Sequence, residues 1–224
     1  MLEWRVEGPI HTHPKKIPRR RPPRFELIAG ALCLDFINTL DDRYSNEPKE
    51  LLKTYLDLAR FGEDAGTISA GQMDELLTRS MHSPESAQRA LEAAIQMREA
   101  MYEVFWALVR KKPVPKGALF VLNSYVQEAA RHMTLVPSDG HFAWEFEDAR
   151  NDFEAPLWPI ARSAAELLAS DQLQFVRACA SKTCEWLFLD ESKNHRRRWC
   201  DMTKCGNRAK AKSFYTRQKR ELSP

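Results

Sequence analysis

Four of the five cysteines in this 224-residue chain form two pairs near its C-terminus. Four residues separate Cys179 from Cys184, four separate Cys200 from Cys205, and fifteen lie between the two pairs. Two pairs of closely spaced thiols, separated by a longer segment, suit a tetrahedral structural zinc site. In such a site each pair supplies two ligands, and the metal joins the two segments. The spacing therefore predicts that these four cysteines bind Zn²⁺.

Other uses of these cysteines are less well supported. The first apolar run is interrupted by Glu3, Arg5 and Glu7, which is unlike a signal peptide, so we expect a reducing compartment where disulfides are rare. A redox dithiol usually has two residues between its cysteines rather than four. Burial without a ligand would not explain the cysteines of the polar segment 199–205. His195 could replace one sulfur, although a solvated loop histidine is the commoner case.

The residues around the cysteines predict two strands followed by a helix. Segments 173–178 and 186–189 are rich in β-branched and aromatic residues, and after Gly206 strong helix formers continue without Gly or Pro until Pro224. This order of knuckle, hairpin, second knuckle and helix resembles a treble-clef zinc finger with Cys205 at the helix start. So short a segment buries little core, so the metal, worth roughly 10–16 kcal/mol of apparent binding free energy, is expected to be its main source of stability.

The charge of the chain is strongly divided, although it sums to only +3. Residues 173–224 hold thirteen Lys or Arg and five Asp or Glu, a net charge of +8, whereas residues 25–172 hold fourteen and twenty-four, a net charge of −10. Residues 1–24 hold seven and two, a net charge of +5. A basic metal-stapled module beside an acidic body is typical of a nucleic-acid-binding head on a regulatory or oligomerising domain.

The cationic side chains of this module are candidate phosphate contacts, because neutralising the phosphate backbone supplies most of the non-specific affinity for nucleic acids. No acidic residue lies between Lys204 and Arg220, whereas a merely solvated helix normally mixes Glu with Lys. Asn207 and Arg208 can read adenine and guanine edges, unless Asn207 caps the helix and Arg208 pairs with Asp201. The predicted nucleic-acid contacts are Arg196, Arg197, Arg198, Asn207, Arg208, Lys210, Lys212, Arg217, Lys219 and Arg220.

Two stretches of the sequence resemble known families. The run Cys205-Gly206-Asn207-Arg208 is the signature of the CGNR zinc-finger proteins, and residues 179–210 resemble their C-terminal finger. The run Leu-Asp-Phe-Ile-Asn-Thr at residues 34–39 is similar to the beginning of ABATE-type domains. The resemblance implies a bacterial, cytoplasmic protein whose zinc finger binds DNA and whose ABATE-type domain belongs to stress-induced transcription regulators.

A polar stripe marks the first predicted helix of the body, residues 31–40. Asp35, Asn38 and Thr39 share one face of this otherwise apolar segment. Such a stripe either satisfies neighbouring backbone and side-chain groups, which is the commoner case, or lines a pocket for a small-molecule effector. The fifth cysteine, Cys33, is expected to pack as a small apolar residue.

Helices dominate the rest of the predicted body. Ser83 followed by Pro84 is a strong start signal, since Ser caps a helix and Pro suits its first position. An Asp139-Gly140 turn between apolar runs predicts a β-hairpin. We expect helices at 51–61, from Ser69 through Leu77, from Pro84 towards Pro113, at 117–133 and at 156–169, and hairpin strands at 134–136 and 141–146.

These features predict a mainly α fold, with a helical body, a small β-hairpin and a C-terminal treble-clef-like zinc finger. Residues 1–24 form a basic, proline-rich flexible arm, residues 25–171 the ABATE-like domain and residues 172–224 the finger. The chain has no membrane span, no Gly-rich phosphate loop and no Ser/His/Asp arrangement, so neither a membrane protein nor an enzyme is predicted.

The predicted function is that of a zinc-dependent, DNA-binding transcription regulator whose body senses a ligand or mediates homodimer formation. One alternative is an RNA- or ribosome-associated protein that uses the same basic finger. Another is an enzyme with a site around Asp35 and Asn38 and a purely structural finger.

Overall fold

The computed structural model describes residues 24–138, 140–147 and 152–221, and helices dominate them. The predicted arm therefore lies outside the described residues, except for Arg24. The fold class is confirmed: a mainly α body carries a small hairpin and a C-terminal finger. The helices are α1 (Leu32–Ile37), α2 (Tyr55–Ala65), α3 (Ala70–His82), α4 (Pro84–Val109), α5 (Lys116–Arg131), α6 (Trp158–Leu168) and α7 (Asn207–Glu221).

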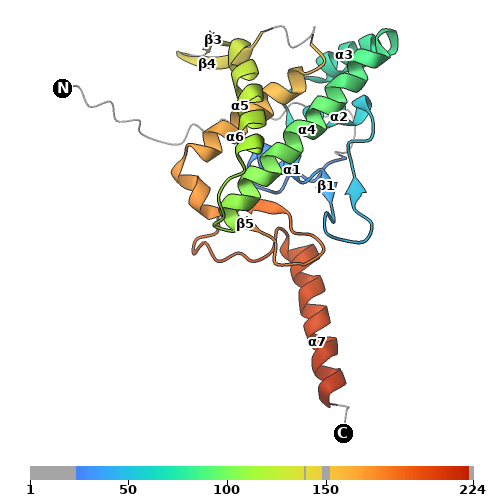
Figure 1. The fold of residues 1–224 in the computed structure, drawn as a ribbon, viewed down its shortest axis with the longest axis vertical. Coiled ribbons are helices and arrows are strands. Elements are labelled where there is room, and N and C mark those ends of the chain that lie inside the picture. The colour runs from blue at the N-terminus through green and yellow to red at the C-terminus, as the bar shows by residue number, and fades with distance from the viewer. Residues whose placement is uncertain (1–23, 139, 148–151, 222–224) are drawn as a thin grey trace, which may run out of the picture.

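Helix α4 is the centre of the body (Figure 1). It begins at Pro84, directly after Ser83 as predicted, and its 26 residues span about 39 Å at about 1.5 Å per residue. Its buried face is built from Ala, Leu, Met and aromatic side chains, and α1, α2, α3 and α5 pack against it. The body is thus a helical bundle organised around one long element.

Helix α2 differs from the prediction at both ends. It begins at Tyr55 rather than residue 51, because Thr54 and Asp57 form a capping box. It also continues through Gly62, beyond the predicted end at residue 61. A Cβ at residue 62 would lie 3.1 Å from Cγ1 of Ile68, so glycine is there to let the α2–α3 linker pack closely.

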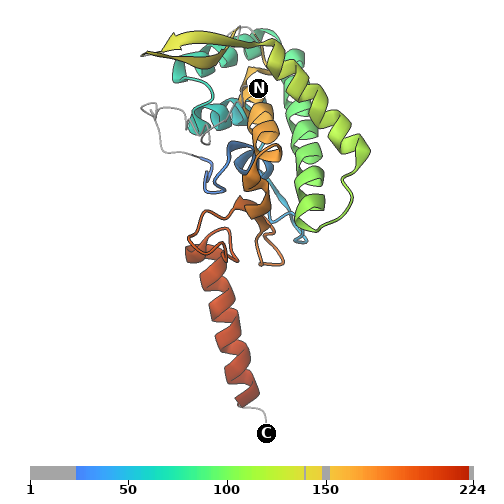
Figure 2. The ribbon, with the colours of Figure 1, turned by 90° about the vertical axis from the view of Figure 1, so that its left-hand side faces the viewer.

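Two antiparallel hairpins flank the bundle (Figure 2). Strands β1 (Leu40–Asp41) and β2 (Lys49–Glu50) form a short ribbon that the sequence did not reveal, and it limits α1 to six residues. Strands β3 (Met133–Ser138) and β4 (His141–Phe146) form the predicted hairpin, which projects from the end of α5. Gly140 of its turn has φ of 82°, the left-handed conformation that favours glycine, and Asp139 lies outside the described residues.

Buried Arg98 joins α4 to the β1–β2 ribbon. Its side chain is 2% exposed and donates to both carboxylate oxygens of Glu50, from Nη1 at 2.6 Å and from Nη2 at 2.7 Å. Its Nε donates to Glu99 at 2.9 Å and its Nη1 to Thr39 Oγ1 at 3.2 Å. A buried guanidinium is tolerated only when its donors are paired, so this network fixes the ribbon on the bundle.

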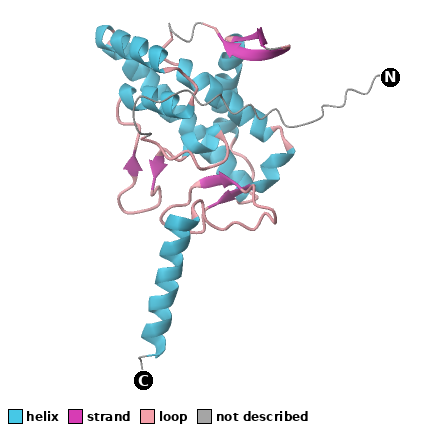
Figure 3. Ribbon diagram, turned by 180° about the vertical axis from the view of Figure 1, so that it is seen from behind, coloured by secondary structure: helices cyan, strands magenta, loops and turns pink. Residues whose placement is uncertain are grey.

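The C-terminal module begins with a 3-10 turn, Asp171–Phe175, followed by β5 (Val176–Ala178) and β6 (Leu187–Leu189). The predicted strand 173–178 is therefore shorter, because Ser170 accepts a hydrogen bond from Gln172 N and starts a helical turn instead. A π-turn, η3 (Met202–Gly206), then leads into α7. Helix α7 extends away from the rest of the molecule (Figures 1 and 3).

Candidate metal centre

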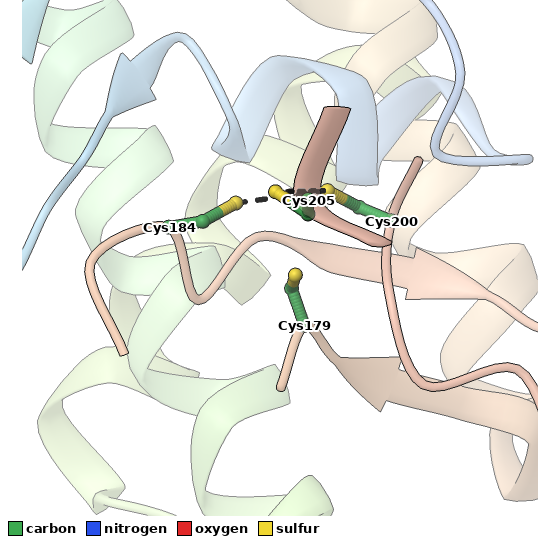
Figure 4. A group of neighbouring side chains, drawn as sticks. All are labelled: Cys179, Cys184, Cys200 and Cys205. Carbon is green, nitrogen blue, oxygen red and sulfur yellow. Dashed lines mark hydrogen bonds between the residues drawn. The ribbon is translucent and has the colours of Figure 1, made fainter. Parts of the chain in front are cut away.

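The four predicted ligands meet in one cluster at the base of α7 (Figure 4). Their sulfur atoms all lie within 4.8 Å of one another, with 3.6 Å between Cys184 and Cys200 and 3.8 Å between Cys200 and Cys205. All four residues are buried, and Cys179 is 3% exposed. The chain thus brings four thiols from two distant segments to one point.

Each knuckle is shaped by backbone hydrogen bonds. Cys179 lies just beyond β5, and its N–H donates to the carbonyl of Trp186 at 2.8 Å, which continues the β5–β6 ladder. The N–H of Cys184 donates to Ser181 O at 3.2 Å and closes the first knuckle. In the second knuckle, Gly206 N donates to the backbone oxygen of Asp201 at 3.0 Å. The sulfurs are therefore positioned by tight turns rather than by long flexible loops.

Asp201 also caps the second knuckle through its side chain. Its carboxylate accepts from Thr203 N at 2.6 Å and from Thr203 Oγ1 at 2.7 Å. These hydrogen bonds, with a longer one from Lys204 N, lower the pKa of Asp201. Asn207 Nδ2 donates to Thr203 O at 3.0 Å, which ties its side chain to the preceding turn; in a helix cap the side-chain oxygen would instead accept from a backbone N–H.

The sulfur separations suit a tetrahedral thiolate site. Metal–sulfur bonds of about 2.3 Å at tetrahedral angles place neighbouring sulfurs about 3.8 Å apart, close to the separations found here. A disulfide would need a separation of about 2.05 Å, and all the cysteines are free. The donor set and its size therefore fit a divalent ion that prefers sulfur ligands.

The electrostatics of the cluster favour a bound cation. The pKa of Cys179 is lowered to about 2, first because Cys184 and then Cys200 donate to its sulfur. The pKa values of Cys184 and Cys200 are raised, chiefly because each donates to Cys179, and burial raises that of Cys205. Four thiolates in this buried site would repel one another and need a compensating positive charge.

The loop between β6 and the second knuckle is organised by Asp190, which is fully buried. Its carboxylate accepts from Ser192 Oγ at 2.6 Å and from the N–H of Arg197 at 2.9 Å. The His195 ring stacks on Phe175 with centroids 3.8 Å apart, and its Nδ1 lies 2.6 Å from the Asp190 backbone oxygen. His195 is therefore held in this loop, outside the four-cysteine group.

The finger is packed directly on the body. Asn38, at the end of α1, forms two hydrogen bonds with the backbone of Leu187: its Nδ2 donates to the carbonyl at 2.9 Å and its Oδ1 accepts from the N–H at 3.1 Å. Leu189 N donates to Ala29 O at 2.7 Å, and Trp186 Nε1 donates to Asp41 at 2.8 Å. Residues Leu187, Phe188 and Leu189 of β6 all belong to the common hydrophobic core.

The polar stripe of α1 is used by hydrogen bonds within the protein. Besides the pair formed by Asn38, Asp35 Oδ1 accepts from Ala29 N at 2.8 Å, and Thr39 Oγ1 donates to Phe36 O at 2.7 Å. These contacts agree with the first of the two interpretations, the satisfaction of neighbouring groups. The effector pocket at these residues stays a prediction.

Asp35 makes the stability of the body pH-dependent. Burial is the main cause that raises its pKa to about 7 from the ordinary 3.8, and the hydrogen bond from Ala29 N opposes the shift. Asp35 loses its proton at a lower pH in the unfolded chain than in the folded protein. The free energy of unfolding should therefore fall as pH rises between about 4 and 7. Asp35→Asn keeps the acceptor oxygen but does not ionise.

The expected result is that the stability of Asp35→Asn relative to the wild type increases with pH across that window. Urea unfolding of both proteins from about pH 5 to about pH 8 measures it. Every other titrating group is common to the two proteins and cancels in the difference. Parallel stability curves would show that Asp35 is ionised throughout.

The predicted nucleic-acid contacts fall into two groups. Arg208, Lys210 and Lys212 are exposed along α7, and Arg196 and Arg198 are exposed in the preceding loop. Among the described side chains, Arg208 forms no ion pair, with Asp201 or any other residue. The side chains of Arg217, Lys219 and Arg220 lie outside the described residues.

Arg197 is used differently from its neighbours. Its Nε donates to the carbonyl of Trp199 at 2.8 Å, its Nη2 bonds the carbonyl of Cys200, and its guanidinium lies 4.7 Å from the ring centroid of Phe188. The side chain thus supports the backbone next to a cluster cysteine. Composition alone did not distinguish this structural arginine from Arg196 and Arg198.

Comparison with known protein families identifies both parts of the chain. A family model named ABATE, described as a putative stress-induced transcription regulator, matches residues 30–171, more than half of the chain. A second family model, the CGNR zinc finger, matches residues 176–218. No curated protein matches this sequence. Within the described residues, no helix has both the length and the apolar composition needed to cross a bilayer.

Proposed function

Since the chain belongs to the ABATE family and ends in a CGNR zinc finger, we propose that it is a zinc-dependent transcription regulator that binds duplex DNA through α7. The observation that carries this proposal is the position of α7. The helix begins two residues after Cys205, the last cysteine of the cluster, and extends away from the body (Figures 1 and 2). Its described cationic side chains, Arg208, Lys210 and Lys212, are exposed.

Cys179, Cys184, Cys200 and Cys205 would hold Zn²⁺ as thiolates. The sulfur separations and the burial of the cluster support this assignment. Bound zinc supplies a cross-link between two segments that have little core of their own. The knuckle of Cys200 and Cys205 leads into the first turn of α7, so its shape determines the direction in which the helix leaves the body.

The dimensions of α7 suit the major groove of DNA. A helix with its side chains is about 10–12 Å across and the groove is about 12 Å wide, so a helix must be free on most of its circumference to enter it. Helix α7 meets this condition, because its main neighbour is the η3 turn that precedes it. Its 15 residues reach about 22 Å at about 1.5 Å per residue.

The exposed cations suit contacts with both edges of such a groove. At about 100° per residue, Arg208 and Lys212 lie on one side of α7 and Lys210 points to another. Exposed Arg196 and Arg198 add charge at the base of the helix. Asn207 is engaged with Thr203, so base readout is assigned to Arg208 rather than to Asn207. An effector for the body and a homodimer remain predictions.

Salt-dependent binding to duplex DNA tests the proposal. Each phosphate contact contributes about −0.9 to the slope of log K against log salt concentration. If Lys210 and Lys212 each contact a phosphate while Arg208 contacts a base, replacing all three by Gln should reduce the magnitude of the slope by about 2 and weaken binding at low salt. Fluorescence anisotropy with a labelled duplex, repeated over a range of KCl concentrations, measures both quantities.

A matched control removes the same charge from the body. Lys53, Arg89 and Arg131 are exposed on the body, and changing them together to Gln should leave the slope almost unchanged. Equal loss in both triple variants would mean that net charge, not α7, determines binding. Preferential binding of a structured RNA of equal length would favour the RNA-associated alternative, and no binding to either polymer would reject the proposed use of α7.

A further inference from the structure

Helix α7 carries two large aromatic side chains that the rest of the protein leaves largely exposed. Phe214 is 55% exposed and Tyr215 is 68% exposed, and their rings meet edge to face with centroids 5.9 Å apart. Aromatic side chains stabilise a protein or a complex when they are buried, so two adjacent exposed rings on a projecting helix indicate a surface that a partner covers.

The two rings belong to one uncharged stripe of α7. At about 100° per residue, Ala211 and Gln218 lie between Phe214 and Tyr215, so the four side chains share an arc of about 100°. All four residues are exposed, whereas Ala209, on roughly the opposite side of the helix, is half-buried. The stripe therefore lies on the side of α7 that the finger leaves open.

Cationic residues border this stripe on both sides. Arg208 is next to Tyr215, and Lys212 lies about 40° further round the helix. On the other side, Lys210 lies about 40° beyond Phe214. An uncharged centre between two cationic edges is complementary to a groove of DNA, in which the base edges lie between two rows of phosphates.

The same arrangement disfavours pairing of α7 with a second copy of itself. Like charges at the borders of the stripe would then be brought together. A fully buried aromatic side chain covers about 150–250 Å², so the exposed parts of Phe214 and Tyr215 offer on the order of 250 Å². A stable dimer buries about 800 Å² on each partner. The stripe is therefore better suited to a polyanion than to another copy of the protein.

The side chains of the stripe match the major-groove edge of A·T base pairs. Ala and Phe side chains make apolar contact with the C5-methyl group of thymine, and Gln can bond both N6 and N7 of adenine. Ala211, Phe214 and Gln218 therefore offer contacts to both bases of such a pair. Arg208 suits the O6 and N7 acceptors of guanine. From residue 208 to residue 218 the helix rises about 15 Å, which corresponds to about four base pairs.

We propose that α7 determines sequence specificity by reading A·T pairs that lie within about four base pairs of a guanine. Ala211 and Phe214 contact thymine methyl groups, and Gln218 bonds adenine. Arg208 bonds the guanine, and the Tyr215 ring packs between it and the A·T contacts. This inference rests on the proposed binding of duplex DNA and goes beyond it, because phosphate contacts carry no sequence information.

Removing thymine methyl groups from the DNA tests the proposal on the unaltered protein. A tight-binding duplex is first selected on the immobilised, zinc-loaded full-length chain from a pool with a random central segment. The selected duplex is then synthesised with either thymine or uracil, which pairs with adenine but has no C5-methyl group. The wild type should bind the uracil duplex about fourfold more weakly for each methyl group contacted, the effect of burying one apolar carbon. Fluorescence anisotropy measures both dissociation constants.

Variants of α7 separate methyl recognition from phosphate contact. Phe214→Ala should weaken binding to the thymine duplex and reduce the ratio between the two dissociation constants. Gln218→Ala should relax the selected preference for adenine at one position. Lys210→Gln should weaken binding to both duplexes equally, because a phosphate contact does not detect the methyl group. Phe120, which is 75% exposed on α5, provides the aromatic control, and Phe120→Ala should leave both constants unchanged.

Equal affinity of the wild type for the thymine and uracil duplexes, with the salt dependence proposed above, would overturn this inference while DNA binding by α7 stands. Tighter binding of a single strand of the same sequence would also overturn it, since Phe214 and Tyr215 would then stack on unpaired bases. No binding to any duplex would reject the proposed function and this inference together.

Discussion

Replacing Cys200 and Cys205 together by Ser should abolish stoichiometric zinc binding and unfold the finger, while most of the helical body stays folded. The variant removes one whole knuckle of the cluster, leaving two thiols to hold the ion. Structural zinc sites supply roughly 10–16 kcal/mol of apparent binding free energy, which exceeds what a module of this size can gain from its own core.

Loss of the metal should also destabilise part of the body. Leu187 and Phe188 of β6 are fully buried and belong to the core shared with α1, so an unfolded finger exposes part of that core. We expect a lower midpoint of thermal unfolding and faster hydrogen exchange in α1, whereas the interior of α4 should keep most of its protection. Strand β5 of the finger contacts α4, but the packing of α4 against α2, α3 and α5 does not involve the finger.

Native mass spectrometry of the reduced protein provides the direct measurement. The wild type should carry one zinc ion per chain, and the double serine variant none. Cys33→Ala is the matched control, since Cys33 is buried in the body away from the cluster and its replacement should keep the metal. A reduced wild type that contains no metal, or a melting curve that a strong chelator leaves unchanged, would contradict the assignment of the cysteines as ligands.

The parts of the fold that could be predicted are those encoded locally. Ser83 with Pro84 starts α4, Ser69 starts α3, and Asp139-Gly140 marks the β3–β4 turn. Gly62 was misleading, because its lack of a side chain serves a tertiary contact with Ile68 rather than a helix end. The β1–β2 ribbon was missed because it depends on Arg98, which reaches Glu50 from a residue 48 positions away.

The candidate site also combines features that are encoded locally with features that depend on distant residues. Ligand spacing within each knuckle is a local property, so the sequence sufficed to select four cysteines that the structure brings together. The support around them is not local: Arg197 bonds the carbonyl of Cys200, and Asn38 bonds Leu187 from 149 residues away. A polar residue in an apolar helix indicates that some partner exists, but not which one. Residue type alone could not separate structural from exposed arginines for the same reason.

Asn38 links the body to the finger through two buried hydrogen bonds. Its side-chain amide forms one hydrogen bond as donor and one as acceptor with the backbone of Leu187, a residue with no exposed surface. Each bond satisfies one buried backbone group of Leu187, its carbonyl or its N–H. Neither group would otherwise have a partner in the β5–β6 ladder. A lost hydrogen bond that leaves such a group unsatisfied costs about 1–3 kcal/mol.

Asn38→Ala should therefore lower the free energy of unfolding by about 3–5 kcal/mol, because two buried groups lose their partner and a small cavity is left. Urea unfolding of the zinc-loaded protein measures this loss. Asn123→Ala is the control, since Asn123 is exposed on α5 and its replacement should change stability by less than about 0.5 kcal/mol. Equal stability of both variants would show that Asn38 does not hold the finger on the body.

If the amide also couples the body to the metal centre, Asn38→Ala should weaken zinc binding by the amount by which it destabilises the zinc-loaded protein more than the metal-free protein, because coupling between two sites is reciprocal. Competition with a chromophoric chelator measures that affinity in both variants. A large loss of stability with unchanged zinc affinity would mean that Asn38 supports the body alone. Parallel losses would establish that α1 and the cysteine cluster fold as one unit, so that the direction of α7 is fixed relative to the body.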